Sequence, residues 1–478
     1  MSNKNLGRSA VWSILNQSVG QALVFFVFLV TARFVSKEAF GIMATSMLAV
    51  ELFKQILIES VGNTFLAKKS PTREEYDAGF AIIFTGGAVS AIIIFFMARP
   101  LATLFGHSEI ADTLRWISLL LFTTGLSKMH EVWLIQHFKF KSLAIRSLTS
   151  ISIGGGIGVY LAVKGYGVSS LIVQQIVTAV ISAVWLWLAS AWRPSHKVRW
   201  SEVIEIFHFC KYVSLNSTSS FFSNQGDVLL SSFYLGPAAT GVYNAAKRLL
   251  VAIALVMSSG LNSVALPALA SLSDDAEQFR NSFLKCVGLT VLFTAPLYAG
   301  LSVLSADVIQ LLMGERWSDV SPVLSILCVA GFVSSFLQYS TNILLISRKS
   351  HWITVFSFLD AAVNITILVL IARHGILYLA SAFILKSLLL SPIMIYLSLK
   401  LLDLKITVYL SFLTFPVAIS IIMASTIYFI KINTNFSAFM NLVLMIPLGV
   451  VVYVSLSFLL NKQSTLDTLN LFRKILKK

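Results

Sequence analysis

Charged residues are scarce in this sequence, and their scarcity excludes most classes of protein. They make up 12% of its 478 residues, whereas a soluble globular protein carries roughly 25%. Hydrophobic residues reach 57%, and the mean hydropathy is +0.83. A chain of this length is long enough for several water-soluble domains, but their surfaces would need far more charge. The composition therefore predicts a polytopic membrane protein.

Cysteine is also scarce, and its placement excludes two kinds of site. Cys210, Cys286 and Cys328 lie in or beside apolar segments, without a CxxC spacing and without histidine at metal-ligand distance. We therefore expect neither a disulfide framework nor a metal site. The glycine-rich run at 154–158 follows no expected strand, so we expect it to pack helices rather than bind a nucleotide. No catalytic grouping is apparent, and no cofactor is predicted.

Long apolar runs are abundant. A bilayer core of about 30 Å requires about 20 helical residues, and about 14 segments are long enough. The runs exceed the strands of a membrane barrel, so the predicted fold class is an all-α polytopic membrane protein. The first run is interpreted as a retained span, because no cleavage site follows it. The expected spans are 12–33, 39–60, 79–98, 112–132, 143–163, 167–191, 208–235, 237–261, 283–304, 320–346, 352–372, 376–399, 407–430 and 437–460.

Lysine and arginine are distributed unequally between the connecting loops. If the amino terminus is cytoplasmic, roughly two thirds of the 36 cations lie on the cytoplasmic side, as the positive-inside rule requires. We therefore predict that both termini are cytoplasmic. The net charge of +15 reflects this bias and contacts with anionic lipid headgroups. Cations scattered over many short loops give no support to a nucleic-acid interaction.

Short motifs recur about 200 residues apart. Phe40-Gly41-Ile42 returns as Thr240-Gly241-Val242, and Leu104-Phe105-Gly106 returns as Leu312-Met313-Gly314. The order of the matches indicates an internal duplication of about six spans, and an even number of spans keeps the copies parallel. The predicted organisation is a first bundle at 1–192, a cytoplasmic linker at 193–211, a second bundle at 212–400, two extra spans at 401–461 and a basic amphipathic tail at 462–478.

Two adjacent cations, Lys247 and Arg248, interrupt the apolar run 242–257. They lie about ten residues from the expected start of their span, so they cannot both reach an interface, and a charge within hydrocarbon is costly. One interpretation is a pair of structural ion bridges, for example to Asp227. The other is an anion-binding site.

The span at 39–60 is the repeat counterpart of the one that carries these cations. It contains Glu51, Lys54 and Glu59, which indicate a polar stripe. An internal Glu51–Lys54 pair and a cavity wall are both compatible with it.

Asp360 and Lys386 lie in two later spans. We favour a local salt bridge between them. A proton or sodium site at Asp360 or Asp227 is the alternative.

An ordered set of motifs extends over nearly the whole chain. It comprises VTAR at 30–33 with FG at 40–41, LGPAATGVYNAA at 235–246, SVALPALA at 263–270 and MGERW at 313–317. With this set the sequence resembles the Wzx-type flippases. They form the polysaccharide-transporter branch of the multidrug/oligosaccharidyl-lipid/polysaccharide (MOP) exporter superfamily, and the colanic-acid type is the most similar.

The resemblance implies two six-helix, MATE-like bundles with two helices appended, in a bacterial inner membrane. It implies movement of undecaprenyl-pyrophosphate-linked oligosaccharide to the outer leaflet, beside membrane lipids and with a polysaccharide polymerase and chain-length machinery as partners. A cationic cavity is expected to hold the pyrophosphate and acidic sugars. The positions that suit this role are Lys247, Arg248, Lys54 and Arg33, and those that suit coupling to a proton or sodium gradient, or charge pairing, are Asp227, Asp360, Glu51 and Lys386.

Two other functions are considered. A drug/cation antiporter of the same superfamily needs an acidic, aromatic cavity, whereas the charge within these spans is mixed and leans basic. An integral glycan polymerase commonly carries its catalytic group on a long outer loop, and no loop here exceeds roughly 20 residues.

Overall fold

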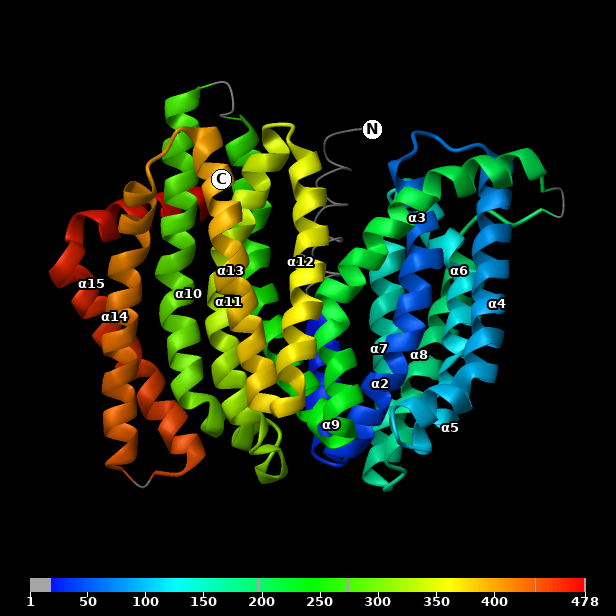
Figure 1. The fold of residues 1–478 in the computed structure, drawn as a ribbon, viewed down its shortest axis with the longest axis horizontal. Helices are drawn as coiled ribbons and strands as arrows, with labels where there is room; N and C mark the ends of the chain where they lie inside the picture. The colour runs from blue at the N-terminus through cyan, green and yellow to red at the C-terminus, as the bar shows by residue number, and fades with distance from the viewer. Residues whose placement is uncertain (1–18, 196–197, 272–274, 435, 477–478) are drawn as a thin grey trace. The chain divides into compact units, whose positions relative to one another are not determined.

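A computed structural model of the chain describes residues 19–195, 198–271, 275–434 and 436–476, and every regular element within them is helical (Figure 1). Within the described residues each predicted span lies on one to three consecutive helical elements, and the spans 208–235 and 237–261 share the single element α9. The start of the predicted first span, 12–18, and the last two residues of the predicted tail lie outside the described residues, as do the side chains of 461–476.

The elements follow one another with short connections. After a helix at Val19–Ala32 they are α2 (Lys37–Phe53), the π-helix η1 (Lys54–Glu59), α3 (Ser60–Ala67), α4 (Arg73–Leu104), α5 (Glu109–Ile117), α6 (Leu119–Gln136), α7 (Phe140–Val163), α8 (Val168–Ala189), α9 (Trp200–Ser271), α10 (Ala276–Leu312), the 3₁₀ turn η2 (Glu315–Trp317), α11 (Val320–Ile346), α12 (Ser350–Ile371), the 3₁₀ turn η3 (Ala372–His374), α13 (Ile376–Leu402), α14 (Ile406–Ile432) and α15 (Ala438–Leu476).

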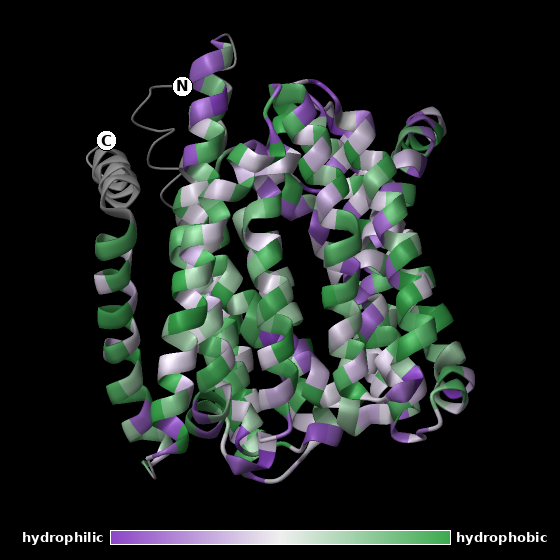
Figure 2. Ribbon diagram, turned by 60° about the vertical axis from the view of Figure 1, so that its left-hand side comes forward, coloured by the Kyte–Doolittle hydropathy of each residue, from purple (hydrophilic) through white to green (hydrophobic). Residues whose placement is uncertain are grey.

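Many helices expose apolar surface along their length. Phe96, Leu188 and Phe429 expose 75%, 76% and 67% of their area, which is costly in water but suits hydrocarbon. Hydrophilic residues gather mainly at the helix ends and in the loops (Figure 2). Ten helices of the described chain are long and apolar enough to cross a membrane. The all-α membrane class is therefore confirmed, whereas the count of about 14 spans stays a prediction.

The chain divides by its packing into two compact units, Met1–Asn244 and Ala245–Lys478. The boundary between these units lies within α9, which begins at Trp200 and whose first half packs in the first unit, and the cytoplasmic linker at 193–211 stays a prediction. There the hydroxyls of Thr45 and Ser232 lie 2.6 Å apart, and the serine-rich sequence of this half supplies such interhelical bonds. That the chain consists of two duplicated repeats of six spans each stays a prediction.

Two glycines set the closest helix crossing of the first unit. A Cβ atom on Gly41 would lie 1.7 Å from the carbonyl oxygen of Pro237, and one on Gly241 would lie 2.0 Å from that of Lys37. The crossing joins α2 to the part of α9 after Gly236, whose φ of 78° turns the chain back. Gly41 and Gly241 are also counterparts in the predicted repeat, so the duplicated motif packs against itself.

The glycine-rich run in α7 has the packing role expected of it. A Cβ atom on Gly154 would lie 2.0 Å from Thr178 Oγ1, and one on Gly158 would lie 2.7 Å from Gln174 Cβ, both in α8. The two helices approach closely because these positions carry no side chain.

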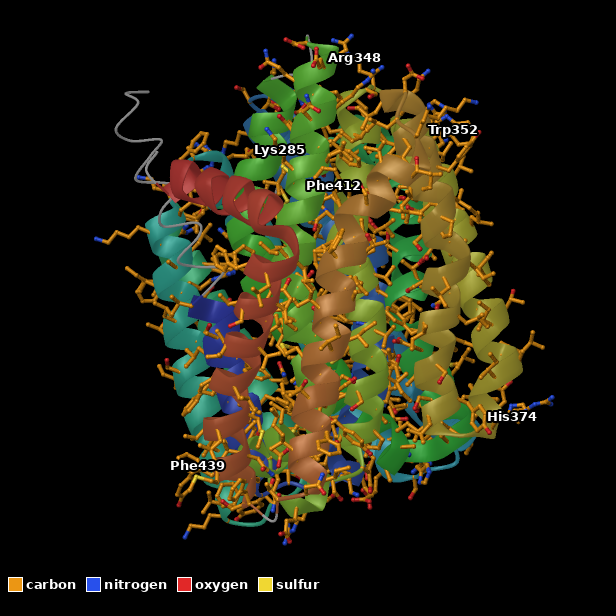
Figure 3. All side chains as sticks on the ribbon, turned by 90° about the vertical axis from the view of Figure 1, so that its left-hand side faces the viewer. Lys285, Arg348, Trp352, His374, Phe412 and Phe439 are labelled. Atoms are coloured by element: carbon orange, nitrogen blue, oxygen red, sulfur yellow. The ribbon has the colours of Figure 1, made fainter. Side chains whose placement is uncertain are left out.

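The second unit contains α10 to α15. Its main apolar cluster includes Phe283, Tyr339 and Tyr409, from α10, α11 and α14. Arg348 and His374 lie at opposite ends of α12 (Figure 3). This helix therefore extends the full depth of its unit.

Candidate functional site

One π-helical segment, η1, interrupts the second predicted span. Residues five apart lie about 140° apart around an α-helix. A π-helix instead bonds residues five apart, so its wider turn brings them towards one face. Lys54 and Glu59, the first and last residues of η1, consequently line the same cavity. A stripe of regular α-helical spacing, as predicted for this span, does not describe this arrangement.

Serine hydroxyls bond two carbonyl groups within η1. Ser60 Oγ donates to the carbonyl oxygen of Gln55 at 2.8 Å, and Ser214 Oγ, from α9, donates to that of Ile56 at 2.7 Å. Backbone carbonyls in a disturbed helix need such partners when water is excluded. The polar residues of α9 thus support the π-helical turn.

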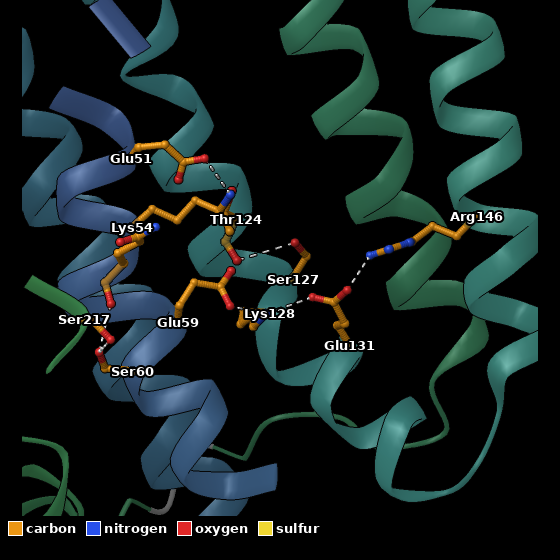
Figure 4. A network of polar contacts seen from close by, with 11 residues as sticks. Glu51, Lys54, Glu59, Ser60, Thr124, Ser127, Lys128, Glu131, Arg146 and Ser217 are labelled. Atoms are coloured by element: carbon orange, nitrogen blue, oxygen red, sulfur yellow. Dashed lines mark hydrogen bonds and ion pairs between the residues drawn. The ribbon is translucent and has the colours of Figure 1, made fainter. Parts of the chain in front are cut away.

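Four charged side chains beside η1 form a continuous network (Figure 4). Lys128 Nζ of α6 lies 2.7 Å from Glu59 Oε2 and 3.1 Å from Glu131 Oε2. Arg146 Nη1 of α7 lies 2.9 Å from Glu131 Oε1. The side chains of Lys128 and Arg146 expose only 11% and 16% of their area. Mutual pairing is what makes this degree of burial tolerable.

A further ion pair adjoins the network. Lys54 Nζ lies 3.4 Å from Glu51 Oε1, one of the two interpretations offered for this span. With this pair included, three cations face three carboxylates, so the cluster is balanced in charge.

The network surrounds a cavity of about 300 Å³ that lies wholly within the first unit. Such a volume is at the lower end of the range for small-molecule sites. Its polar lining comes from η1, α6, α7 and α8 and consists of Lys54, Glu59, Thr124, Ser127, Lys128, Glu131, Arg146 and Ser182.

Sequence reasoning missed three members of this network. Lys128, Glu131 and Arg146 lie within the expected spans 112–132 and 143–163, but none of them was predicted to be a site residue. All three lie within helices, since α6 continues to Gln136 and α7 begins at Phe140. Three-residue spacing between Lys128 and Glu131 was the available signal, because residues so spaced share a helix face.

Arg33 is not part of this cluster. It is exposed in the turn before α2, and the 17 residues of α2 separate that turn from Lys54. A helix of that length spans about 25 Å. The structure therefore does not bring Arg33 and Lys54 together.

Lys247 and Arg248 lie in the second unit, on the later half of α9. Lys247 is half-buried and Arg248 is exposed, whereas their neighbours Ala246 and Leu249 are buried. An apolar face of this helix thus packs into the unit while Arg248 points away from that packing.

Asp227 is buried in the first unit, where the two halves of α9 lie against each other. Its Oδ2 accepts a 2.8 Å hydrogen bond from the hydroxyl of Tyr243, and its Oδ1 accepts one from the backbone N–H of Val228.

Asp360 and Lys386 are brought together in the second unit. Lys386 Nζ lies 3.3 Å from Asp360 Oδ2, and 4.9 Å from the ring centre of Phe383. The favoured local salt bridge is therefore present.

No group of three or more potential metal ligands occurs in the described part of the chain. Cys210, Cys286 and Cys328 are free thiols. The arrangement offers charged and hydroxylated surface to a ligand.

Solved transport proteins share this fold. A lipid II flippase, MurJ in its inward closed conformation, superposes with a TM-score of 0.77 at 18% identity, over 95% of this chain and 99% of that one. An inward-facing multidrug resistance MATE family transporter of the MOP superfamily gives 0.58 at 11% identity, over 82% and 98%. The chain thus shares its fold with these two membrane proteins.

The family follows from the sequence match. Residues 29–322 match the model of a polysaccharide biosynthesis protein family, and the chain belongs to that family. The succinoglycan biosynthesis transport protein ExoT of Rhizobium meliloti (strain 1021) is 26% identical over 340 residues, 70% of this chain and 69% of that protein. The lipopolysaccharide biosynthesis protein WzxC of Escherichia coli (strain K12) is 21% identical over 362 residues, 74% of each chain. The resemblance found in the sequence is confirmed at the level of this family, and ExoT, one of the similar proteins, is itself named for transport.

Proposed function

We propose that this protein is a flippase that moves an undecaprenyl-pyrophosphate-linked oligosaccharide from the cytoplasmic to the periplasmic leaflet, for surface polysaccharide assembly. The observation that carries the proposal is a polysaccharide-biosynthesis family match on a fold shared with a lipid II flippase. ExoT is named for transport in succinoglycan biosynthesis, which supports a saccharide cargo.

The physical task is to carry a charged, hydroxylated headgroup through about 30 Å of hydrocarbon. Lys247 and Arg248 project about 100° apart on their helix. We assign them to the pyrophosphate, with Lys54 as a further contact and Arg33 as a contact near the helix end. The lipid tail stays in the membrane while the two units alternate in access.

The proposal includes an architecture of about 14 spans, as two six-helix bundles with two helices appended, in a bacterial inner membrane with both termini cytoplasmic. Coupling to a proton or sodium gradient is assigned to Asp227, Asp360 or Glu51, with Lys386 as the charge partner of Asp360. A polysaccharide polymerase and chain-length machinery receive the cargo.

Transport in vesicles of known orientation tests this function. Purified protein is reconstituted, and a labelled undecaprenyl-pyrophosphate-linked oligosaccharide is followed to the opposite leaflet. We expect protein-dependent movement that falls at least about tenfold in Lys247→Ala/Arg248→Ala, because charge-assisted bonds to the pyrophosphate are lost. Arg115→Ala, which removes a half-buried cation paired with the exposed Asp112 and outside the proposed site, is the control and should transport normally.

Other outcomes would redirect the assignment. If the correctly inserted double variant transports the lipid as well as the wild type does, Lys247 and Arg248 do not bind the pyrophosphate. Movement of an organic cation but not of the lipid would favour a drug/cation antiporter, the function that the MATE likeness suggests.

A further inference from the structure

The cavity of the first unit has bonding capacity that the proposed pyrophosphate contacts do not use. Of its charged residues, only Lys54 has a part in that proposal. The remainder form the ion-paired network of Glu59, Lys128, Glu131 and Arg146. Its chemistry therefore needs its own explanation.

The balance of charge favours a neutral ligand over an anion. A phosphate beside Lys128 would also lie near Glu59 and Glu131, whose carboxylates are within 3.1 Å of the Lys128 ammonium. Repulsion at such distances offsets the attraction of the cation. A polyhydroxylated ligand meets no such opposition, because carboxylates accept from hydroxyl groups while ammonium and guanidinium groups donate to them.

Individual polar groups in the wall remain available. The side chains of Glu59 and Glu131 expose 30% and 23% of their area, so their carboxylates keep accessible surface beside the Lys128 ammonium. The hydroxyls of Thr124 and Ser127 donate to backbone carbonyls within α6, at 2.6 Å and 2.8 Å, so their oxygen atoms remain acceptors.

The position of the cavity matches an early stage of transport. Glu59 and Lys128 lie eight residues before Ala67 and Gln136, the ends of α3 and α6, and Arg146 lies six residues after the start of α7 at Phe140. These distances are about 12 Å or less along each helix. The proposed topology assigns those ends to the cytoplasmic side, where the cargo is loaded.

We propose that this cavity binds a sugar of the cargo oligosaccharide. Glu59 and Glu131 accept hydrogen bonds from sugar hydroxyl groups, and the hydroxyl oxygens of Thr124 and Ser127 accept further ones. This inference rests on the proposed function, to which it adds a site that recognises the saccharide. The π-helical turn is the local device that presents Glu59 to this sugar, beside the Lys54 that is assigned to the pyrophosphate.

Binding of a lipid-free saccharide to the full-length purified protein is the test. The probe is the repeat-unit oligosaccharide released by mild acid from the host strain's own surface polysaccharide, and binding is measured by isothermal titration calorimetry. We expect saturable binding that Glu59→Gln weakens about tenfold, since a charge-assisted hydrogen bond becomes a neutral one. Ala179→Leu fills the cavity without changing a charge and should abolish binding.

Matched controls separate this effect from misfolding. Glu109→Gln makes the same chemical change at an exposed position of α5, and Ala362→Leu adds the same side chain at an exposed position of α12. Both should bind like the wild type. Thermal unfolding of each variant reports its fold, and if Glu59→Gln is unstable, Ala179→Leu decides the question.

The outcomes distinguish this inference from the proposed function. Absence of binding to the wild type, or equal binding by a folded Ala179→Leu variant, would overturn the sugar site. If the wild type transports the lipid-linked substrate but does not bind the saccharide, the flippase proposal stands and the sugar site is refuted. If the protein binds the saccharide but transports no lipid-linked substrate, the sugar site is supported and the flippase function is refuted.

Discussion

At the residue scale, Gly41 and Gly241 determine how closely α2 and α9 approach. Each lies where a Cβ atom would overlap a backbone carbonyl of the other helix. Backbone cannot move aside as a flexible side chain can, so any larger residue must separate the helices.

Gly41→Ala should therefore destabilise the first unit by about 1–3 kcal/mol, the usual cost of overpacking. Thermal unfolding of the purified protein in detergent measures the loss. The control is Gly156→Ala in α7, where an added Cβ meets no atom within 4 Å. A stability equal to that of this control would refute the close crossing.

Lys128 illustrates a second lesson at this scale. Its ammonium group is held between two carboxylates from different helices, so its environment depends on residues 69 positions away as well as on a near neighbour. Its place in the expected span 112–132 predicts a helix but not these partners, because position in sequence does not record which helices pack together.

At the element scale, one buried cluster fastens α14 and α15 to α10. Lys431 of α14 forms an ion pair with Asp307 of α10, and Asn441 Nδ2 of α15 donates to the other oxygen of that carboxylate at 2.9 Å. The side chain of Asp307 is only 7% exposed. Apolar packing that includes Ile419, Met423 and Met445 surrounds the same helices.

Asp307→Ala should cost about 3 kcal/mol or more, because it leaves the Lys431 ammonium largely buried without its partner. The double variant Asp307→Ala/Lys431→Ala should cost less than the two single changes added together. Thermal unfolding of the wild type, the two single variants and the double variant measures these costs and completes the double-mutant cycle. Strict additivity would mean that this pair does not hold the last two helices in place.

The π-helical segment also belongs to this scale. Its residues KQILIE carry no sequence signal that separates them from α-helix. The hydroxyl that bonds Ile56 comes from Ser214, far along the chain, so the local sequence alone was insufficient to predict the turn.

At the scale of the whole molecule, orientation in the membrane is the property most open to test. The distribution of cations predicts cytoplasmic termini. Arg348 and His374, at opposite ends of α12, should then face the cytoplasm and the periplasm respectively (Figure 3).

Arg348→Cys and His374→Cys, each in a cysteine-free background, provide the measurement. A membrane-impermeant maleimide applied to intact cells with a permeable outer membrane should label only the second variant. Permeabilising the inner membrane should expose the first. Both positions are exposed, so accessibility within the protein does not limit labelling. The reverse pattern would place the termini outside.

Sequence alone determined the all-α membrane class and the family of this protein. The length of the apolar runs and the scarcity of charge can be read from the sequence directly. Because a lipid bilayer offers no hydrogen-bond partners to the backbone, such runs can cross it only as helices or closed barrels. The tertiary structure decided where α9 divides between the units and how η1 is wound. It also decided which charges meet, since Glu59, Lys128 and Arg146 become neighbours only when three helices pack together. Coulombic and hydrogen-bond energies depend on distance in space, which a linear pattern records only within one helix.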